Sequence, residues 1–522
     1  MPMLLHDVLD QAAARRPGAL ALVHAQGSLT FDELSRRAAR LSAALGRLVP
    51  PGAPVAIVGD NGPEWVEGYY GVPAGGHVLA MVNHRLAPAE QAAVVEAAGA
   101  RAVLGSPDCL SALLDGGHLP SGVTGVAFGP AYERFIAGEG PTSTAVDRQS
   151  GPVDPDGPAW LIFTSGTTGR PKGVQLSHRN LLTGALTNGM ARGVADDDVY
   201  LYPFPLCHVA GHNVISYHLR SRPVVLVPRY RTDAFCDAVA RHRVTAASLA
   251  PTMIHSLVEE AGGGDRSKLR SLRSLSYGSA PITPTLLQRT VDLLGDVDLS
   301  QGYGMTETAG NVSFLGPDDH RRGFAGDVGL LSTAGRPGPL VQLRIVDPDG
   351  APSATGQVGE VTVHGDQVHL GYWGDPAATE EATLSDRSGR RWLRTGDLGR
   401  VDAGGRLTIV DRLKDIIVTG GENVSTREVE DVLSRVPGVM EVAVVGVPDP
   451  HWGESVGAAV VVRPGAGVTA TSVRSFARQW LSGFKTPRRV VVVPRLPRNA
   501  LGKVAKAELR AILADGDRLP GR

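Results

Sequence analysis

The sequence predicts an α/β protein: a large N-terminal domain of layered α/β subdomains plus a small β-barrel-like part, followed by a small α+β C-terminal domain. Short apolar runs alternate with helical patterns as far as about Pro281, which is typical of largely parallel sheets covered by helices. From about Gly356, glycines separate strand-like runs. After Asp411 a compact helix-and-strand pattern extends over roughly 110 residues, enough for a separate domain.

In the N-terminal part, the segment 30–45 predicts a helix. Thr30 suits the N-cap position, and apolar residues follow it at helical spacing: Leu34, Ala38, Leu41 and Ala44. Buried strands, one of them followed by a turn and a helix, are expected in six further runs: 54–65, 77–86, 101–106, 223–228, 246–251 and 271–281.

The sequence pattern changes in the C-terminal third. Between Gly356 and Asp411 the chain predicts hairpins, with glycine turns at Gly396 and at 404–405. Beyond them a helix is expected over 426–436. Three strands should follow, over 441–447, 457–462 and 488–494.

Composition excludes several classes of protein. The 522 residues contain 52 Lys+Arg against 53 Asp+Glu, so bulk electrostatics favours neither nucleic acid nor an anionic membrane as a partner. The three cysteines, Cys109, Cys207 and Cys236, form no CxxC pair, which argues against a disulfide framework or a structural zinc site. The N-terminus lacks the apolar core of a signal peptide, and no apolar run is long enough to span a bilayer. We therefore expect a cytoplasmic protein.

The segment "IFTSGTTGRPKGV", residues 162–174, looks suited to holding phosphates. Glycines let backbone N–H groups approach oxygens closely, hydroxyls donate, and Lys172 supplies a mobile charge. It is not a Walker loop, because Lys172 lies between Pro171 and Gly173 and no metal-binding hydroxyl follows it. A dinucleotide GxGxxG is also absent here. The alternative is an ordinary surface loop.

Four later stretches also carry chemistry: "QGYGMTET" (301–308), "LRTGDLG" (393–399), "DRLKDIIVTGGENV" (411–424) and "PRNALGKVAK" (497–506). Singly, each could be a turn, a solvated charge cluster or a surface lysine. Together with the phosphate loop, and in this order, they resemble the adenylate-forming superfamily of acyl-CoA synthetases, carrier-loading adenylation domains and firefly luciferase. The resemblance runs from "LTFDEL" to the C-terminal stretch, and it is greatest to stand-alone acyl-CoA synthetases.

The resemblance implies a two-step reaction. A carboxylate attacks the α-phosphorus of ATP to give an acyl-adenylate and pyrophosphate, and a thiol then attacks the acyl carbon and expels AMP. ATP and CoA would be co-substrates and Mg²⁺ the cofactor. The phosphate loop would grip the leaving pyrophosphate through Thr164, Ser165, Gly166, Thr167, Thr168, Gly169 and Lys172.

The same resemblance assigns the nucleotide site. Tyr303 would stack on adenine, and the "YGSAP" stretch would form the opposite wall, although many relatives carry glycine where Ser279 stands. Glu307 would hold Mg²⁺, because carboxylate oxygens suit this hard cation. The remaining nucleotide contacts implied are Ala280, Pro281, Gly302, Gly304, Met305, Thr306 (on the α-phosphate), Asp397 (on the ribose hydroxyls) and Arg412.

A mobile C-terminal domain is also implied. Residues 1–410 would form the N-terminal domain, 411–415 a hinge with Lys414 at its pivot, and 416–522 the domain that rotates between the two half-reactions. Lys503 would bridge the carboxylate and phosphate during adenylation. After rotation, Gly420 and Gly421 would leave room for the pantetheine arm of CoA.

The acid itself is the least readable part. The resemblance places His208 beside the carboxylate, where it shapes the acyl channel, and the acyl pocket would include Val209, Asn213, Val214, Tyr277 and Gly278. Cys207 is interpreted as packing, since the chemistry needs no enzyme thiol. The three candidate pocket segments, 208–219, 276–281 and 308–315, contain no arginine, which argues against a dicarboxylate and favours an apolar or bulky acid. CoA is the expected acceptor; the alternative is an enzyme that loads a separate carrier protein.

Overall fold

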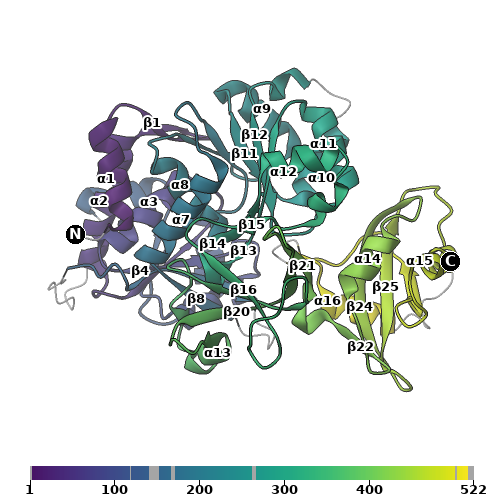
Figure 1. The fold of residues 1–522 in the computed structure, drawn as a ribbon. Helices are drawn as coiled ribbons and strands as arrows, with labels where there is room; N and C mark the ends of the chain where they lie inside the picture. The colour runs from purple at the N-terminus through teal and green to yellow at the C-terminus, as the bar shows by residue number, and fades with distance from the viewer. Residues whose placement is uncertain are drawn as a thin grey trace. The chain divides into compact units, whose positions relative to one another are not determined.

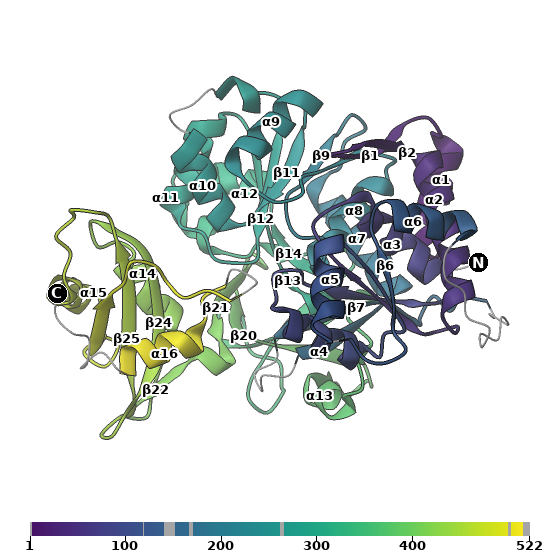
Figure 2. The same cartoon turned by 180° about the vertical axis from the view of Figure 1, so that it is seen from behind.

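The computed structural model describes residues 3–117, 119–139, 152–165, 171–261, 266–499 and 503–514. The chain divides into two compact units, each described here by itself (Figures 1 and 2). The first contains Met1–Leu343, Val363–Leu393 and Gly405–Leu407. The second contains Arg344–Thr362, Arg394–Gly404 and Thr408–Arg522. Compactness does not test which residues move together, so the hinge at 411–415 and the flanking domain bounds stay predictions.

A seven-stranded sheet forms one layer of the first unit, in the order β18-β8-β7-β4-β3-β5-β6. Strands β3 to β7 run parallel, whereas β8 is antiparallel to both β7 and β18. The strands span Pro54–Val58 (β3), Val78–Val82 (β4), Ala102–Gly105 (β5), Thr124–Ala127 (β6), Pro158–Ser165 (β7), Pro171–Ser177 (β8) and Gly371–Tyr372 (β18).

A nine-stranded sheet forms a second layer, in the order β15-β14-β13-β12-β11-β9-β10-β1-β2. Strands β9 to β13 are parallel, and β14 turns back antiparallel to β13. The strands span Leu20–His24 (β1), Gly27–Thr30 (β2), Tyr200–Tyr202 (β9), Val224–Leu226 (β10), Ala246–Leu249 (β11), Ser274–Gly278 (β12), Asp298–Met305 (β13), Gly310–Leu315 (β14) and Arg336–Pro337 (β15).

Helices fill the space between these two sheets and cover their outer faces. One hydrophobic cluster joins Ile57 of the first sheet and Tyr202 of the second to side chains of α1, α2, α3, α7 and α8. The alternate residues Val58 and Leu201 face outward, into clusters with α4 and α5 and with α9 to α11 respectively. The strands are buried on both faces, as expected of parallel sheets, and the layered α/β prediction is confirmed.

The helices of the first unit are α1 Leu5–Arg15, α2 Phe31–Leu48, α3 Pro63–Ala74, α4 Pro88–Ala98, α5 Pro107–Asp115, α6 Pro130–Arg134, α7 His178–Arg192, α8 His212–His218, α9 Thr232–His242, α10 Pro251–Ala261, α11 Pro284–Leu294, α12 Pro317–Phe324 and α13 Pro376–Glu381. The helix predicted after Thr30 is confirmed as α2. Its N-cap hydroxyl accepts a hydrogen bond from the Glu33 N–H at 3.2 Å, and the Glu33 carboxylate accepts one from the Thr30 N–H, a capping box.

A third sheet takes the order β16-β17-β20-β19, with β21 paired to β20. Its strands are β16 Gln342–Val346, β17 Gly359–His364, β19 Thr383–Ser385, β20 Arg391–Val401 and β21 Leu407–Arg412. The predicted turn at 404–405 is present between β20 and β21. The turn predicted at Gly396 is wrong: Gly396 lies inside β20 with φ +70°, a conformation that glycine adopts without strain and that does not reverse the chain here.

The C-terminal part of the second unit is an α+β fold in its own right. Its sheet has the order β23-β22-β25-β24, with β26 parallel to β25. The predicted helix and three strands are all present, with the helix ending three residues earlier than expected. The elements are β22 Ile417–Thr419, β23 Glu422–Val424, α14 Thr426–Leu433, β24 Val439–Asp449, β25 Gly453–Val462, α15 Ala470–Trp480, β26 Arg489–Val492 and α16 Lys506–Ala514.

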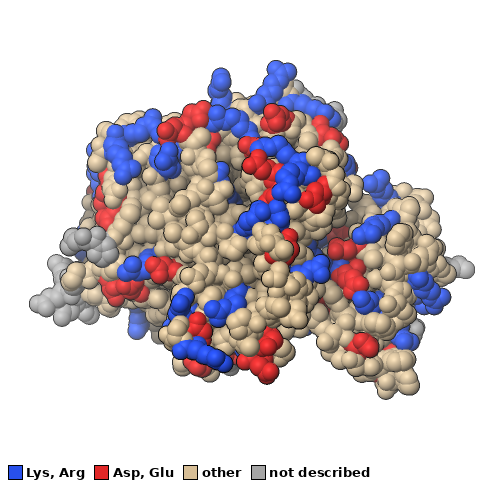
Figure 3. Space-filling view, viewed as in Figure 1, with Lys and Arg blue, Asp and Glu red and all other residues tan. Residues whose placement is uncertain are grey.

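Basic and acidic side chains are interspersed over the face of the molecule in Figure 3. Within the described ranges, no helix is both long enough and apolar enough to cross a membrane.

Candidate active site

The proposed phosphate loop connects two antiparallel strands. Thr164 at the end of β7 pairs with Lys172 at the start of β8, and Ser165 pairs with Pro171. The chain thus passes from the loop into a strand, unlike a Walker loop, which leads into a helix. Four of the predicted phosphate contacts, Gly166, Thr167, Thr168 and Gly169, lie outside the described residues, as does the side chain of Ser165.

Lys172 and Glu307 are brought to the same place by a residue that the sequence did not single out, Tyr372. The Tyr372 hydroxyl donates a hydrogen bond of 3.0 Å to Oε1 of Glu307. The Lys172 ammonium lies 5.1 Å from the centre of the Tyr372 ring, a cation–π distance. Because burial and the neighbouring Glu307 carboxylate both disfavour a phenolate, the pKa of Tyr372 is raised, and its hydroxyl keeps the proton that it donates.

The short 3₁₀ turn that carries Glu307, Thr306–Thr308, is fixed by backbone and side-chain bonds. The Glu307 carbonyl accepts from the His369 N–H at 2.8 Å. The buried amide of Gln367 donates to the carbonyls of Thr308 (2.8 Å) and Asn311 (3.0 Å). Thr306 itself is half-buried beside Glu307. Glu307 is therefore held in one position rather than on a loose loop.

Glycines at the ends of β12 and β13 permit a close approach of neighbouring strands. A Cβ on Gly302 would lie 2.4 Å from Nδ2 of Asn311, and one on Gly304 would lie 2.0 Å from the Gly310 carbonyl oxygen. A Cβ on Gly278 would lie 2.4 Å from the Gly302 carbonyl oxygen. Strand packing is thus a sufficient reason for all three glycines, whether or not a nucleotide also lies against them.

The stretch after β12 is exposed, and one of its residues is strained. Ser279, Ala280 and Pro281 are all exposed to solvent. Ser279 has φ +69°, in the left-handed region that favours glycine. Tyr303, the residue expected to stack on adenine, lies half-buried on β13 opposite Ser313 of β14.

A cavity of about 80 Å³ opens at the carboxyl ends of the parallel strands β11, β12 and β13. In α/β sheets this edge is where ligands bind. Four of the predicted acyl-pocket residues line it, namely Val209, Asn213, Tyr277 and Gly278. Ser279, Gly304 and Met305, which were assigned to the nucleotide, line it too.

Among the lining residues that were not predicted, two carry a charged or titratable side chain. Arg192, the last residue of α7, belongs to none of the three segments that were searched for arginine. The absence of arginine from those segments therefore does not extend to the whole cavity wall. His212 also lines the cavity: its Nδ1 is 2.8 Å from the Val209 carbonyl oxygen, and its buried Nε2 has no hydrogen-bond partner among the described residues.

The remaining predicted pocket residues lie elsewhere. Val214 is fully buried in the hydrophobic core between the two sheets and does not line this cavity. His208 is half-buried next to Val209, and its Nε2 lies 3.8 Å from Sγ of Cys207. Burial raises the pKa of Cys207 to about 12, so the thiol stays protonated and is no nucleophile.

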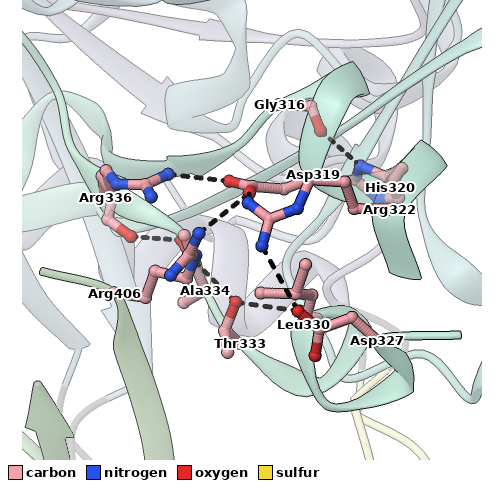
Figure 4. A network of polar contacts seen from close by, with 12 residues as sticks. Gly316, Asp319, His320, Arg322, Asp327, Leu330, Thr333, Ala334, Arg336 and Arg406 are labelled. Atoms are coloured by element: carbon pink, nitrogen blue, oxygen red, sulfur yellow. Dashed lines mark hydrogen bonds and ion pairs between the residues drawn. The ribbon is translucent and has the colours of Figure 1, made fainter. Parts of the chain in front are cut away.

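Figure 4 shows a polar network around Asp319 and His320 of α12, and His320 also contacts Tyr277, which lines the cavity. The Tyr277 hydroxyl is 2.7 Å from Nε2 of His320, whose Nδ1 is 2.8 Å from the Gly316 carbonyl oxygen. Since a carbonyl can only accept, Nδ1 carries the proton and Tyr277 donates to Nε2. On the same helix, Asp319 meets Arg336 at 2.8 Å and Arg406 at 3.3 Å. The hydroxyl of Tyr277 is thus bonded to His320.

Asp397 and Arg412 meet within the second unit. Nε of Arg412 lies 3.0 Å from Oδ1 of Asp397. The Asp397 N–H donates to Oγ1 of Thr395 at 3.1 Å, which fixes the β20 backbone at this point. The two residues expected to contact the ribose are therefore already neighbours.

The predicted hinge is followed by a firmly held helix start. Asp411 accepts hydrogen bonds of 3.0 Å from the hydroxyls of both Ser425 and Thr426, at the N-terminus of α14. Lys414 itself is exposed on the following 3₁₀ turn, Leu413–Asp415.

The two glycines assigned to the pantetheine channel form the turn of a hairpin. Gly420 and Gly421 connect β22 to β23 with φ +58° and +85°, as a two-residue hairpin turn requires. A Cβ on Gly420 would also meet the Trp452 ring at 2.6 Å. Lys503 lies exposed after β26, and its N–H donates to Oδ1 of Asn499 at 3.0 Å.

The residues that sequence reasoning missed gave no local signal. Tyr372 lies 65 positions after Glu307 and reaches it only because β18 pairs with β8. Arg192 resembles an ordinary basic residue in the last turn of a helix. His212 lay within a pocket segment, but nothing in its spacing distinguished it from His208.

Comparisons with known proteins agree with this architecture. The family described as AMP-binding enzyme matches residues 9–373, and AMP-binding enzyme C-terminal domain matches 428–503. Feruloyl-CoA synthase of Amycolatopsis sp is 35% identical over 504 residues, 95% of this chain and 96% of that protein. The fatty acid–[acyl-carrier-protein] ligase ScoC of Streptomyces coeruleorubidus is 33% identical over 506 residues, 95% and 94% of the two chains.

A solved structure carries the reaction intermediate of such an enzyme. The o-succinylbenzoate CoA synthetase MenE of Bacillus subtilis, in complex with the acyl-adenylate intermediate, superposes with a TM-score of 0.82 at 28% identity, covering 96% of this chain and 97% of that one. Fold and site therefore define an adenylate-forming enzyme. The chain belongs to the AMP-binding enzyme family. It is an AMP-forming acid–thiol ligase that uses ATP, and several of its relatives, feruloyl-CoA synthase among them, are named as CoA synthases or CoA ligases.

Proposed function

We propose that this enzyme converts a carboxylic acid to its acyl-adenylate with Glu307, Lys172 and Thr306 around the phosphates, and then transfers the acyl group to CoA. The observation that carries the proposal is the Lys172–Tyr372–Glu307 cluster. It joins a cation and a carboxylate near the cavity at the carboxyl ends of β11 to β13. Nucleotidyl transfer needs charge neutralisation and alignment rather than an enzyme nucleophile. The cluster supplies both signs of charge.

Glu307 also fits a role as the protein ligand of Mg²⁺. Its carboxylate is buried, and no Lys or Arg of the described chain forms an ion pair with it. Mg²⁺ is usually held by one or two carboxylates together with substrate phosphates, and it would neutralise phosphate charge. Tyr372 would orient the carboxylate by donating to Oε1, which leaves Oε2 for the ion.

In the adenylation step, Lys172 would bind the departing pyrophosphate, with Thr164 and the loop that follows it. The adenine would lie between Tyr303 and the exposed stretch from Ser279 to Pro281. Lys503 would compensate the charge that develops between carboxylate and phosphate. In the second step, rotation at Lys414 would withdraw Lys503, and Gly420 and Gly421 would face the pantetheine arm.

A carrier protein is the second candidate acceptor, and one observation favours it: the relative ScoC is named a fatty acid–acyl-carrier-protein ligase. The expected apolar or bulky acid has support in part of the cavity wall, where Phe204, Leu249 and Met305 are apolar. We also keep the prediction of a cytoplasmic location.

The test is product analysis. Purified protein with ATP, Mg²⁺, CoA and a panel of acids should release AMP and pyrophosphate and form acyl-CoA. ADP and phosphate as products would overturn the proposal, because the α-phosphorus would not have been attacked. Replacing CoA by a phosphopantetheinylated carrier protein in parallel reactions decides between the two acceptors.

A further inference from the structure

The cavity at the carboxyl ends of β11 to β13 has a charged side chain in its wall. Arg192 is half-buried there, and its Nη1 donates a hydrogen bond of 2.9 Å to Oγ of Ser248. The same serine oxygen is 2.9 Å from the Tyr200 hydroxyl, and the Arg192 guanidinium also interacts electrostatically with that hydroxyl. Ser248 and Tyr200 are neutral, so neither balances the charge.

No carboxylate of the described chain lies within ion-pair distance of Arg192. By contrast Arg37, another partly buried arginine of the same unit, meets Glu67 at 2.7 Å and Glu133 at 2.6 Å. A guanidinium has five N–H donors in a planar fork, and holding it away from water without acceptors costs free energy. Donors of Arg192 are therefore available to an oxygen that enters the cavity.

A second group in the wall also lacks a partner. His212 is 2% exposed, and its Nε2 has no hydrogen-bond partner among the described residues. Because Nδ1 must donate to the Val209 carbonyl, Nε2 is an acceptor in the neutral ring. Burial lowers the pKa of His212 to about 4, so the ring stays neutral at pH 7. A hydroxyl on the ligand could donate to this nitrogen.

We infer that the acid activated by this enzyme carries an oxygen substituent, a hydroxyl or a second carboxylate, at the end away from the reacting carboxylate, and that Arg192 selects for it. The inference rests on the proposed function and names its substrate class. It modifies the expectation of an apolar or bulky acid: the apolar wall of Phe204, Leu249 and Met305 suits a hydrocarbon chain, whereas the distal end is polar.

The experiment compares acids that differ only at the distal position. Butanoate, 4-hydroxybutanoate and succinate form one series; benzoate, 3-hydroxybenzoate and benzene-1,3-dicarboxylate form the other. Pyrophosphate release with ATP and Mg²⁺ gives kcat/KM for each acid. Wild-type enzyme should prefer an oxygenated acid to its parent in at least one series. The preferred substituent then tells whether Arg192 meets a hydroxyl or a second anion.

Arg192→Met should lower the ratio of oxygenated to parent acid by about 10- to 100-fold, the usual effect of a hydrogen bond to a charged group. Arg192→Lys keeps the charge but loses the planar fork, so its ratio should lie between those of the wild type and Arg192→Met. The matched control is Arg179→Met: Arg179 lies on the same helix but forms an exposed ion pair with Asp156. It should leave the ratio unchanged.

Two failures are distinguishable. Pyrophosphate release that favours the parent acids, or a ratio that Arg192→Met and Arg192→Lys leave unchanged, overturns this inference while the proposed function stands. Absence of AMP and pyrophosphate formation with every acid overturns the proposed function, and the inference falls with it.

Discussion

The Tyr372 hydroxyl donates a 3.0 Å hydrogen bond to the Glu307 carboxylate, while the Lys172 ammonium lies 5.1 Å from the centre of the same ring. Tyr372 thus contacts Glu307, which is assigned to the metal, through its hydroxyl. It contacts Lys172, which is assigned to the phosphates, through its ring. Pairing of β18 with β8 and a Glu307 turn bonded to His369 hold the three residues together. Pre-orientation of charges in this way lowers the reorganisation needed during the reaction.

Tyr372→Phe should remove the hydrogen bond to Glu307 and keep the ring beside Lys172. We expect adenylation to slow by about 10-fold or more, the usual worth of a hydrogen bond to a charged acceptor. Pyrophosphate release over a range of Mg²⁺ concentrations measures it. The control is Tyr230→Phe, which removes a hydroxyl that bonds the Met253 carbonyl at 2.8 Å on α10. Equal rates in the two variants would contradict the role of Tyr372.

Glu307→Gln tests the metal role directly. The change keeps the shape of the side chain but removes the charge that would face Mg²⁺. Adenylation should slow by roughly 10²-fold or more, the scale of a lost electrostatic contribution in an active site. A rate close to wild type at saturating ATP and Mg²⁺ would take Glu307 out of the metal site.

More of the fold than of the site could be predicted from the sequence. Local signals were sufficient for the capped helix after Thr30 and for the valine-rich strands of the second unit, because helix caps and strand runs are set by neighbouring residues. The turn expected at Gly396 was wrong because glycine in a strand interior has the same local signature as glycine in a turn.

The cavity shows the limit of such reasoning. Val209, Tyr277 and Gly278 were found because they belong to recognisable stretches. Arg192 was not, because it lies at the end of α7 and its side chain meets Ser248 of β11, 56 positions further along the chain. Contacts between distant segments carry no spacing pattern, and here the missed contact is the one on which the inference about the acid rests.

Ser279→Gly should stabilise the protein. Ser279 has φ +69°, which costs a non-glycine residue about 1–2 kcal/mol. Glycine removes this strain but adds freedom to the unfolded chain, so the net gain should be at most about 1 kcal/mol. The midpoint of denaturant unfolding measures it. Ser279→Ala loses the same hydroxyl but keeps a Cβ, and should give no gain. Stabilisation by both variants would implicate the hydroxyl instead of the backbone.

Stability should fall on mild acidification. Burial lowers the pKa of four histidines, His178, His212, His218 and His369, to about 4. The unfolded chain, with pKa values near 6.5, therefore binds more protons between pH 6.5 and 4. Their contribution to stability is fully present above pH 6.5 and is lost toward pH 4, at up to about 1.4 kcal/mol per pH unit for each histidine.

Denaturant unfolding at intervals from pH 7.5 to pH 4.5 measures this slope. His451→Gln is the control, because this exposed histidine should leave the slope unchanged. A midpoint that does not move between pH 6.5 and 5 would show that the buried rings are protonated in the folded protein.

The last prediction concerns the two half-reactions. Lys503→Ala should abolish acyl-adenylate formation, because the charge developing between carboxylate and phosphate loses its compensating cation. The same variant should still convert a supplied acyl-adenylate and CoA to acyl-CoA, since the rotated domain has carried position 503 away. Lys414→Pro should show the reverse defect: proline fixes φ near −65° and restricts the pivot. Rates of the two half-reactions, measured separately, test the hinge. Equal losses in both steps for both variants would exclude a rotation at Lys414, and Lys503 would then have to act throughout the reaction from a single position.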